Sequence, residues 1–384
     1  MTYLKALQLS SFRNYATSDL SGLSGGPVVL CGANGAGKTN VLEAISFLSP
    51  GRGLRTAKIS EIQNRDTEMT AAPWSVSALI ESAYGPVRIG TGRDGAEDKR
   101  IIRINGEAAK GGQAAMTEYV SVIWLTPQMD RLFADAATGR RKFLDRMVFA
   151  FDPGHSGRTT RYENAMRQRS KLLQIGNTDP AWLDGLEATM AETGVAIAAA
   201  RQDFIRRLQQ AVDRTPAAIQ AHFPRAIMGL RGTVEELVRR VPALEVEEML
   251  RYQLKASRMQ DSQTGGAATG PHKSDLLVQY DAKTMPADQC STGEQKALLV
   301  GMVLAHARMI GAERGAPPVL LLDEVAAHLD EDRRAMLYKI LLDLKVQVFM
   351  TGTDLALFEP LSQDGHFLNV ASGNITAVKQ GIAA

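Results

Sequence analysis

Gly32-Ala33-Asn34-Gly35-Ala36-Gly37-Lys38-Thr39 is the stretch that decides the fold of this 384-residue chain. It has the spacing G-x-x-x-x-G-K-[ST], and it lies between an apolar run, Val28 to Cys31, and a helix-forming run, Val41 to Ile45. This order predicts a strand, a glycine-rich phosphate loop and a helix. Glycines let backbone N–H groups point at a phosphate, and the helix N-terminus adds positive potential. The stretch therefore predicts an α/β domain that binds a nucleotide.

The side chains of Lys38 and Thr39 have the most specific expected roles in this loop. The lysine ammonium reaches the β and γ phosphate oxygens, and the threonine hydroxyl can ligate Mg²⁺. A chance match to a short pattern is the alternative, and the flanking strand and helix disfavour it. The residues expected to bind the cofactor here are Gly32, Asn34, Gly35, Ala36, Gly37, Lys38, Thr39 and Asn40.

A second motif consists of the apolar run Val319 to Leu322 followed by Asp323 and Glu324. The run predicts a buried parallel strand, and carboxylates at the carboxyl end of such a strand lie in the ligand crevice. We expect Asp323 to hold Mg²⁺ and Glu324 to be catalytic, together with Lys38, by orienting and deprotonating the attacking water. General base catalysis of this kind contributes ~10²- to 10⁴-fold in rate. Behind a phosphate loop, the two acids indicate ATP hydrolysis.

A third motif, Ser291-Thr292-Gly293-Glu294-Gln295, precedes the apolar helical run Ala297 to Leu304. A serine hydroxyl, a glycine N–H and a helix N-terminus together suit an anion. Taken alone, an ordinary serine cap is the better explanation. Its place about 30 residues before the acidic strand resembles the order in ABC-type ATPases, whose signature segment has this form. Ala327 to Asp330 likewise resembles the D-loop that follows in these proteins.

Composition sets broad limits on the class of protein. The chain is 45% apolar, so it can bury a large core, and its net charge of +2 supports no general claim about nucleic acid. Cys31 and Cys290 are the only cysteines, and they predict neither a disulfide framework nor a zinc site. No apolar run approaches the ~18 residues that span a bilayer. We therefore expect a cytoplasmic protein with no membrane partner.

The pattern along the chain changes in the middle. Residues 3 to 125 predict strands around the phosphate loop, and Asn105-Gly106 predicts a tight hairpin turn. The period becomes helical from about Ala134 to Leu254, and Asp261 to Gly270 has the composition of a flexible connector. We predict a discontinuous ATPase domain, 1–132 and 271–384, and an inserted, mainly helical lobe with a short arm, 133–270. The fold class is α/β, with mixed sheets around a P-loop core.

Five segments in order resemble one family. Phe12 to Tyr15, Gly35 to Ile45, Arg140 to Asp145, Gly270 to Lys273 and Ser291 to Gln295 resemble the RecF family of bacterial replication and repair proteins, which are SMC-like ABC ATPases. The resemblance implies an ABC-type (SMC/RecF-like) ATPase head and an ATP-dependent homodimer on gapped and double-stranded DNA. It also implies a weak DNA-dependent ATPase whose slow hydrolysis resets the dimer, and which assists RecO and RecR in loading RecA.

The resemblance also assigns residue roles by position. Each nucleotide would lie between one subunit's phosphate loop and the other's signature, so Ser291, Gly293 and Gln295 would serve the partner's nucleotide. Gln128 would be the Q-loop residue and a metal ligand. The remaining residues matched to cofactor positions are Arg13, Asp330 and Thr353. Arg13 has an ordinary surface arginine as its alternative, and Thr353 stands where many ABC enzymes have a switch histidine.

Basic residues gather in the expected lobe. Residues 133–260 hold 20 Lys and Arg against 15 Asp and Glu, and the window from Arg140 to Lys171 holds nine basic residues against three acidic ones. Such a cluster can neutralise DNA phosphates without reading bases. A solvated helical face with local ion pairs is the alternative. The candidate DNA-binding residues are Arg140, Arg141, Arg167, Arg169 and Lys171.

Three other classes of protein fit less well. A nuclease-coupled ABC ATPase of the SMC-like type would need a nuclease domain, and little chain follows Thr353. A transporter ATP-binding subunit is disfavoured by the missing switch histidine, the atypical signature and the insert. A purely structural SMC-type tether would need long heptad repeats, which the sequence lacks.

Overall fold

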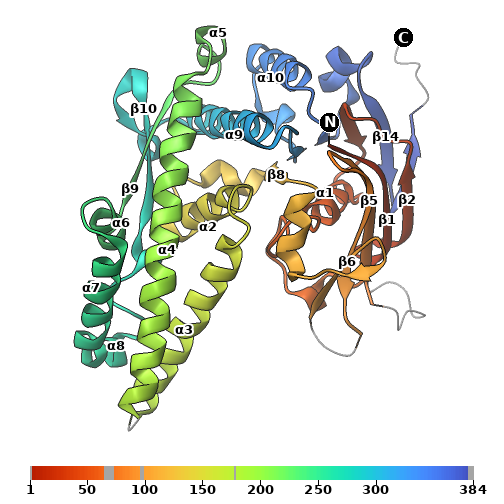
Figure 1. Ribbon diagram of the computed structural model, residues 1–384. Coiled ribbons are helices and arrows are strands. Elements are labelled where there is room, and N and C mark those ends of the chain that lie inside the picture. The colour runs from red at the N-terminus through yellow and green to blue at the C-terminus, as the bar shows by residue number, and fades with distance from the viewer. Residues whose placement is uncertain (1, 65–72, 96–98, 177–178, 379–384) are drawn as a thin grey trace. The chain divides into compact units, whose positions relative to one another are not determined.

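The computed structural model describes residues 2–64, 73–95, 99–176 and 179–378 (Figure 1). The chain folds as two compact units, each made from separated segments. The first unit comprises Met1–Asp130, Thr215–Pro224 and Leu299–Ala384, and the second comprises Arg131–Arg214 and Arg225–Leu298. The phosphate loop and the acidic strand both belong to the first unit, whereas the signature segment belongs to the second.

The first unit contains a six-stranded sheet built around the phosphate loop. Its strand order is β15-β14-β3-β13-β12-β8, and every neighbouring pair is parallel except β14 and β15. The residues of β3, β8, β12 and β13 are all buried, which explains their continuous apolar sequences. The strands are β3 (Pro27–Cys31), β8 (Val122–Leu125), β12 (Val319–Leu322), β13 (Val348–Gly352), β14 (His366–Ala371) and β15 (Asn374–Ala377).

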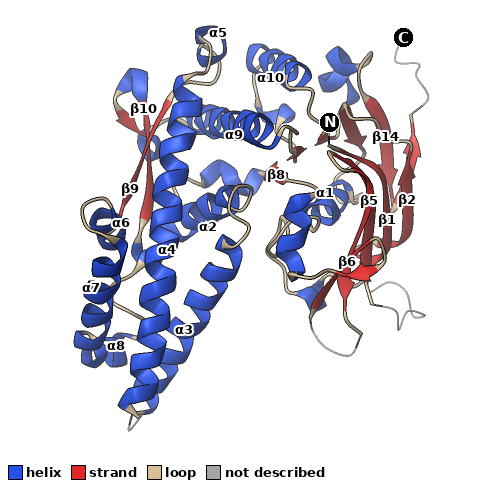
Figure 2. Ribbon diagram, viewed as in Figure 1, coloured by secondary structure: helices blue, strands red, loops and turns tan. Residues whose placement is uncertain are grey.

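The same unit has a second, antiparallel sheet with the order β2-β1-β4-β5-β6-β7 (Figure 2). Burial alternates along β4, as expected for a sheet with one face on the core. The predicted hairpin turn is confirmed, since Asn105 and Gly106 both have positive φ, 51° and 91°. The strands are β1 (Tyr3–Phe12), β2 (Tyr15–Ser21), β4 (Ser75–Ser82), β5 (Gly85–Arg93), β6 (Arg100–Ile104) and β7 (Glu107–Ala108).

One hydrophobic core joins these two sheets through helix α1 (Lys38–Ser46). Leu7 and Val76 from the antiparallel sheet, Leu30 from the parallel sheet, and Val41 and Ile45 from α1 belong to one buried cluster. The helix that follows the phosphate loop is therefore fixed from both sides. The other helices of this unit are α5 (Ala217–Gln220), α10 (Glu331–Asp343) and the short 3₁₀ helices Ile59–Glu61, Gly112–Glu118, Pro127–Arg131, Ala326–His328 and Leu355–Leu361. Helix α9 (Thr292–Arg314) begins in the second unit and ends in the first.

The second unit is mainly helical. Helices α3 and α4 lie side by side, and α6, α7 and α8 pack around them (Figure 1). Helix α4 begins at an Asp179 cap followed by Pro180, which suits a first helical position. Its helices are α2 (Ala137–Val148), α3 (His155–Ile175), α4 (Pro180–Asp213), α6 (Thr233–Val238), α7 (Ala243–Ala256) and α8 (Arg258–Thr264). A small antiparallel sheet has the order β11-β10-β9, with β9 (Ala226–Arg231), β10 (Asp275–Tyr280) and β11 (Met285–Pro286), and three 3₁₀ turns are Pro271–Lys273, Asp281–Lys283 and Ala287–Gln289.

The predicted fold class is confirmed, and the predicted limits of the two domains stay a prediction. The expected connector from Asp261 to Gly270 is corrected at its start, because Asp261 to Thr264 are the last residues of α8 and Asp261 is buried. Strands β2, β9, β11, β14 and β15 were not predicted. Among the described residues, no helix is both long and apolar enough to cross a membrane.

Candidate nucleotide-binding site

The phosphate loop ends at Gly37, whose backbone conformation only glycine adopts easily. Its φ is 114°, and a Cβ there would lie 2.5 Å from Asn14 Nδ2 and 2.8 Å from the Tyr15 hydroxyl oxygen. Helix α1 begins at the next residue, and no side chain caps it. The first-turn N–H groups of a helix lack partners within the helix. In this helix the Asn40 N–H donates to the Gly37 carbonyl at 2.9 Å, and the positive end of the helix at the loop favours an anion.

Asn14 and Tyr15 stabilise the phosphate loop by donating hydrogen bonds to its carbonyl groups. Asn14 Nδ2 donates to the Ala36 carbonyl at 3.1 Å, and the Tyr15 hydroxyl donates to the Gly37 carbonyl at 3.1 Å. Asn40 Nδ2 donates to Asn14 Oδ1 at 2.6 Å. Burial raises the pKa of Tyr15, so its hydroxyl remains a donor at neutral pH. Neither bracing role was predicted, although both residues lie in the Phe12 to Tyr15 segment.

Lys38 and Thr39 lie where the loop meets the parallel sheet. Lys38 Nζ donates to the carbonyls of Gly32 at 2.7 Å and Ala33 at 2.9 Å, so the ammonium lies inside the loop. Thr39 Oγ1 donates to Asp323 Oδ1 at 3.0 Å. The structure thus brings together the two motifs that lie 284 residues apart in the sequence.

Thr351 on β13 forms hydrogen bonds with both acidic residues that follow β12. Its hydroxyl donates to Asp323 Oδ1 at 2.8 Å and accepts from the Glu324 N–H at 2.9 Å. Burial raises the pKa of Asp323, against the hydrogen bonds from Thr351 and Thr39, which lower it. Glu324 has a φ of 54°, a conformation that is uncommon for a residue with a side chain and that occurs at functional sites. Sequence reasoning missed Thr351, and Thr353 is exposed two residues further on.

Arg13 forms an ion pair with the buried Glu43. Its Nε and Nη2 donate to the Glu43 carboxylate at 2.9 and 2.6 Å, and Nη1 donates to the Glu61 carbonyl at 2.9 Å. Glu43 is fully buried on α1, and Arg55 Nη1 lies 3.0 Å from the same carboxylate. The two arginines neutralise a charge beside the phosphate loop. A contact from Arg13 to a phosphate stays a prediction, and it would require exchange of the Glu43 ion pair.

Gln128 and Asp330 lie on the surface of the first unit. Gln128 is exposed in the turn after β8, and Asp323 directly follows the neighbouring strand β12. Asp330 caps α10, because its Oδ1 accepts from the Arg333 N–H at 2.9 Å. Within the described parts of the chain, no three His, Cys, Asp or Glu side chains gather as a metal site. Thr39 and Asp323 supply two oxygen ligands, which fits Mg²⁺, an ion that keeps several waters and takes phosphate oxygens.

The signature segment of the second unit forms a capping box at the start of α9. Glu294 Oε2 accepts from the Ser291 N–H and hydroxyl, both at 2.9 Å, and Lys283 pairs with Oε1 of the same carboxylate. The Lys283 contact, followed by the hydrogen bonds from Ser291, lowers the pKa of Glu294 to about 2. Ser291 and Gly293 are exposed, as a role toward a second subunit requires. Gln295 is buried and donates to the Cys290 carbonyl at 2.9 Å. Its side chain therefore stabilises the signature segment, and the predicted nucleotide contact is corrected.

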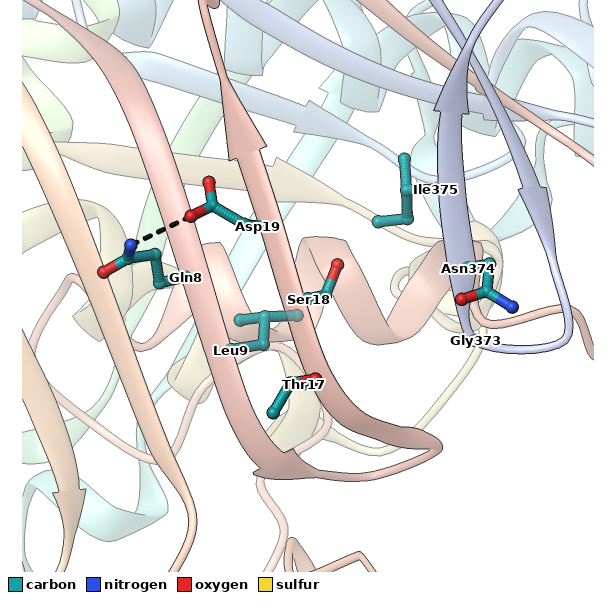
Figure 3. Close-up of a pocket in the computed structure, with 8 residues that line it drawn as sticks. All are labelled: Gln8, Leu9, Thr17, Ser18, Asp19, Gly373, Asn374 and Ile375. Atoms are coloured by element: carbon teal, nitrogen blue, oxygen red, sulfur yellow. Dashed lines mark hydrogen bonds between the residues drawn. The ribbon is translucent and has the colours of Figure 1, made fainter.

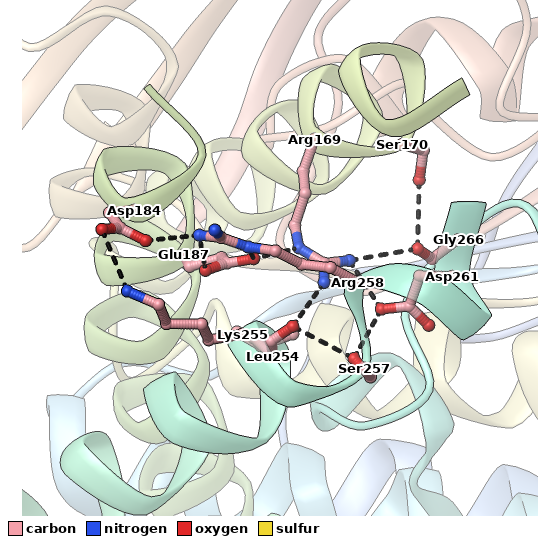
Figure 4. Close-up of polar contacts among 10 residues, drawn as sticks. All are labelled: Arg169, Ser170, Asp184, Glu187, Leu254, Lys255, Ser257, Arg258, Asp261 and Gly266. Atoms are coloured by element: carbon pink, nitrogen blue, oxygen red, sulfur yellow. Dashed lines mark hydrogen bonds and ion pairs between the residues drawn. The ribbon is translucent and has the colours of Figure 1, made fainter. Parts of the chain in front are cut away.

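The candidate DNA-binding residues differ in their exposure. Arg140 forms a two-point ion pair with Asp275, and Arg141 donates to the Ser274 carbonyl at 2.7 Å. Arg169 is fully buried (Figure 4). The prediction that Arg169 contacts DNA is therefore wrong, because its guanidinium pairs with Glu187 and Asp261 inside the second unit. Arg167 and Lys171 are exposed on α3.

A groove of about 440 Å³ lies in the first unit at the edges of its two sheets (Figure 3). It carries no basic side chain, so it does not suit a phosphate. Gly373, on its rim, has a φ of 78°, and a Cβ there would lie 2.7 Å from the Asn14 carbonyl oxygen. The lining residues are Gln8, Leu9, Thr17, Ser18, Asp19, Gly373, Asn374 and Ile375.

The fold and the phosphate loop together define an ABC-type ATPase head of the SMC kind. The RecF/RecN/SMC N terminal domain family matches residues 3–365, and the chain belongs to this family. A relative from Mesorhizobium japonicum (strain LMG 29417 / CECT 9101 / MAFF 303099), named DNA replication and repair protein RecF, is 48% identical over 376 residues, 97% of each chain.

Two solved structures share the fold. One, described as the recombination mediator protein RecF-ATPrS in the RecFOR pathway, has a TM-score of 0.84 at 23% identity and covers 98% of both chains. The other, RecF-ATP in the same pathway, has a TM-score of 0.82 at 23% identity, again over 98% of both chains.

Proposed function

We propose that this protein is an ATP-dependent DNA-binding protein of recombinational repair and replication restart. The observation that carries the proposal is the hydrogen bond from Thr39 Oγ1 to Asp323 Oδ1 at 3.0 Å. This contact supports the proposal, because a phosphate-loop hydroxyl and an acidic side chain at this distance can share one Mg²⁺ ion. The relative named DNA replication and repair protein RecF supports the biological role.

The residues present fit ATP and Mg²⁺. Backbone N–H groups at the start of α1 would bind phosphate oxygens, and Lys38 would turn from the Gly32 and Ala33 carbonyls toward the β and γ phosphates. Mg²⁺, when bound, would neutralise phosphate charge. Glu324 would orient and deprotonate the attacking water. Burial raises the pKa of Asp323, and a bound cation would lower it again.

An ATP-dependent homodimer would complete the site. The exposed Ser291 and Gly293 at the start of α9 would contact the nucleotide held by the other subunit, and Asp330 and Thr353 would lie near that seam. A γ-phosphate at Ser291 would displace the Glu294 carboxylate, which now accepts both Ser291 donors. ATP would therefore promote assembly, and slow hydrolysis would end it.

The proposed partners follow from the family and from the charge of α3. Gapped and double-stranded DNA would be bound by the dimer, which would assist RecO and RecR in loading RecA in the cytoplasm. DNA would stimulate a weak ATPase. The name of the first solved structure places that RecF in the RecFOR pathway.

The dimer mechanism can be tested by preventing hydrolysis. Glu324→Gln keeps the shape of the side chain and removes the base, so ATP should convert the variant into a persistent dimer while wild type returns to monomer. Light scattering with Mg²⁺-ATP measures the mass directly. The matched control is the double variant Glu324→Gln, Ser291→Arg, which should stay monomeric although its phosphate loop is intact. A monomeric single variant that still binds ATP would contradict the mechanism.

A further inference from the structure

Large hydrophobic side chains are exposed mainly on one part of the second unit. Nine such side chains are exposed among the described residues, and six of them lie between residues 175 and 259. Trp, Tyr and Met are the types enriched at the centres of protein interfaces. The six are Ile175, Trp182, Leu244, Met249, Tyr252 and Met259.

Four of these side chains lie on α7 and α8. Helix α7 packs on α4 (Figure 1) through its buried Val246, Leu250 and Leu254. Leu244 and Tyr252 are eight residues apart on the opposite side, with Glu248 between them at i+4. Tyr252 is 76% exposed. Residues at this spacing form a stripe along a helix, and Met249 lies beside it. Met259 is exposed near the start of α8.

The charges on this stripe are acidic and unbalanced. Glu245 and Glu248 are exposed, and neither forms an ion pair within the ranges that the structure describes. Lys255 is paired with Asp184 at 3.3 Å. Arg251 is exposed on the same side of α7, at i+3 from Glu248, so among the described residues the two exposed carboxylates outnumber the one exposed base that has no acid partner there. The stripe therefore offers apolar contacts with two free carboxylates among them.

A cluster of charged residues holds this surface in place (Figure 4). Arg258 of α8 donates to both Glu187 oxygens of α4, at 2.9 and 2.6 Å, and it also pairs with Asp184. Arg169 of α3 donates to the Leu254 carbonyl at 2.6 Å, near the end of α7. The end of α7 is thus bonded to α3, and the start of α8 is bonded to α4. A surface that is rigid before binding loses less entropy on binding.

We propose that the outer face of α7 and α8 is a docking surface for a basic amphipathic helix of another protein. We call this the α7–α8 face and define it by Leu244, Glu245, Glu248, Met249, Tyr252 and Met259. Apolar residues at helical spacing suit a helical partner, and the two free carboxylates suit lysine or arginine. They repel DNA phosphates. They also repel the same face of a second copy, because a two-fold contact would set like charges against each other.

A defined peptide tests the surface on the full-length protein. The probe is a labelled synthetic helix of about 18 residues, or about five turns, with a leucine stripe and lysines elsewhere. Fluorescence anisotropy should give a saturable affinity that weakens at least about tenfold in Tyr252→Ser. It should also weaken, and lose most of its salt dependence, in Glu245→Gln, Glu248→Gln. The same peptide with glutamate in place of lysine should not bind measurably.

Tyr84→Ser is the matched control, because Tyr84 of the first unit is also 76% exposed. It should bind the peptide as wild type does, and peptide binding should slow amide exchange in α7. Equal affinity in wild type and Tyr252→Ser would overturn the proposal, as would binding of the glutamate peptide. Self-association in sedimentation that Tyr252→Ser abolishes would also overturn it in favour of a second copy. No ATP is present, so failure here leaves the proposed ATPase function untouched.

Discussion

At the scale of single residues, Thr351 connects the two acids at the end of β12. Its hydroxyl donates to Asp323 and accepts from the Glu324 N–H, so one side chain affects both a charge and a backbone conformation. The donated hydrogen bond favours the carboxylate form of Asp323, against burial, which favours the protonated form. The accepted bond helps to hold the positive φ of Glu324. The threonine therefore prepares the site for a cation.

Replacing Thr351 by valine should weaken Mg²⁺-dependent ATP binding about tenfold, which corresponds to about 1.4 kcal/mol. The variant keeps the shape of the side chain but removes the donor, so the already raised pKa of Asp323 rises further. Protonated Asp323 cannot ligate Mg²⁺, and the loss of binding on acidification should therefore begin at a higher pH than in wild type. Titration of ATP binding with Mg²⁺ across mildly acidic pH measures both effects. Thr376→Val, on an exposed residue of β15, should show neither. An unchanged Thr351→Val profile would contradict the assignment.

Motif spacing in the sequence predicted that the phosphate loop and the acids after β12 would lie together, whereas the roles of these residues stay a prediction. The loop from Gly32 to Thr39 and the pair after β12 have fixed relations to a strand and a helix, and the structure places Thr39 within hydrogen-bond distance of Asp323. The bracing residues could not be predicted in the same way. Thr351 lies on β13, which pairs with β12, whereas Tyr15 contacts the loop from β2 of the other sheet. The sequence does not show which of these segments become neighbours.

At the scale of elements, the cluster around Arg169 joins α3, α4 and α8. The guanidinium donates to Glu187 at 2.8 Å and to Asp261 at 2.7 Å, and all three side chains are almost completely buried. Burying such groups costs free energy that is recovered only when charges and hydrogen bonds are well matched. The helical pattern from about Ala134 to Leu254 predicted helices in this part of the chain, but it did not show that a buried position of α3 would carry an arginine.

Arg169→Met should destabilise the protein by about 3 kcal/mol or more, because it leaves Asp261 and part of Glu187 buried without their main partner. Urea unfolding followed by circular dichroism measures the change in the free energy of unfolding. Arg167→Met, two residues earlier on the exposed side of the same helix, is the control and should change stability by no more than about 0.5 kcal/mol. Equal stability of the two variants would show that the buried ion pairs contribute little to holding α8.

At the scale of the whole molecule, the basic residues among residues 133–260 fall into two groups. Some pair with acids inside the second unit, and others are exposed without an acid partner in the described part of the chain. Arg140 and Arg169 pair with acids inside the second unit. Arg167 and Lys171 are four residues apart on the exposed face of α3, and neither forms an ion pair among the residues that the structure describes. A count of charges in the sequence could not separate these two groups, because only burial and partners distinguish them.

Reversing both exposed charges, in Arg167→Glu, Lys171→Glu, should weaken binding to duplex DNA in the presence of ATP and lower the salt dependence of the affinity. The slope of log affinity against log salt should fall by about one for each DNA phosphate that the protein no longer neutralises. Arg88→Glu, Arg103→Glu is the matched control, because it changes the net charge equally at exposed positions on β5 and β6 of the first unit. Gel-shift or anisotropy measurements at several salt concentrations give both quantities. If the control variant loses as much DNA affinity and salt dependence as the α3 variant, net charge rather than the face of α3 determines DNA binding. If only the α3 variant loses affinity and salt dependence, DNA phosphates lie along that helix.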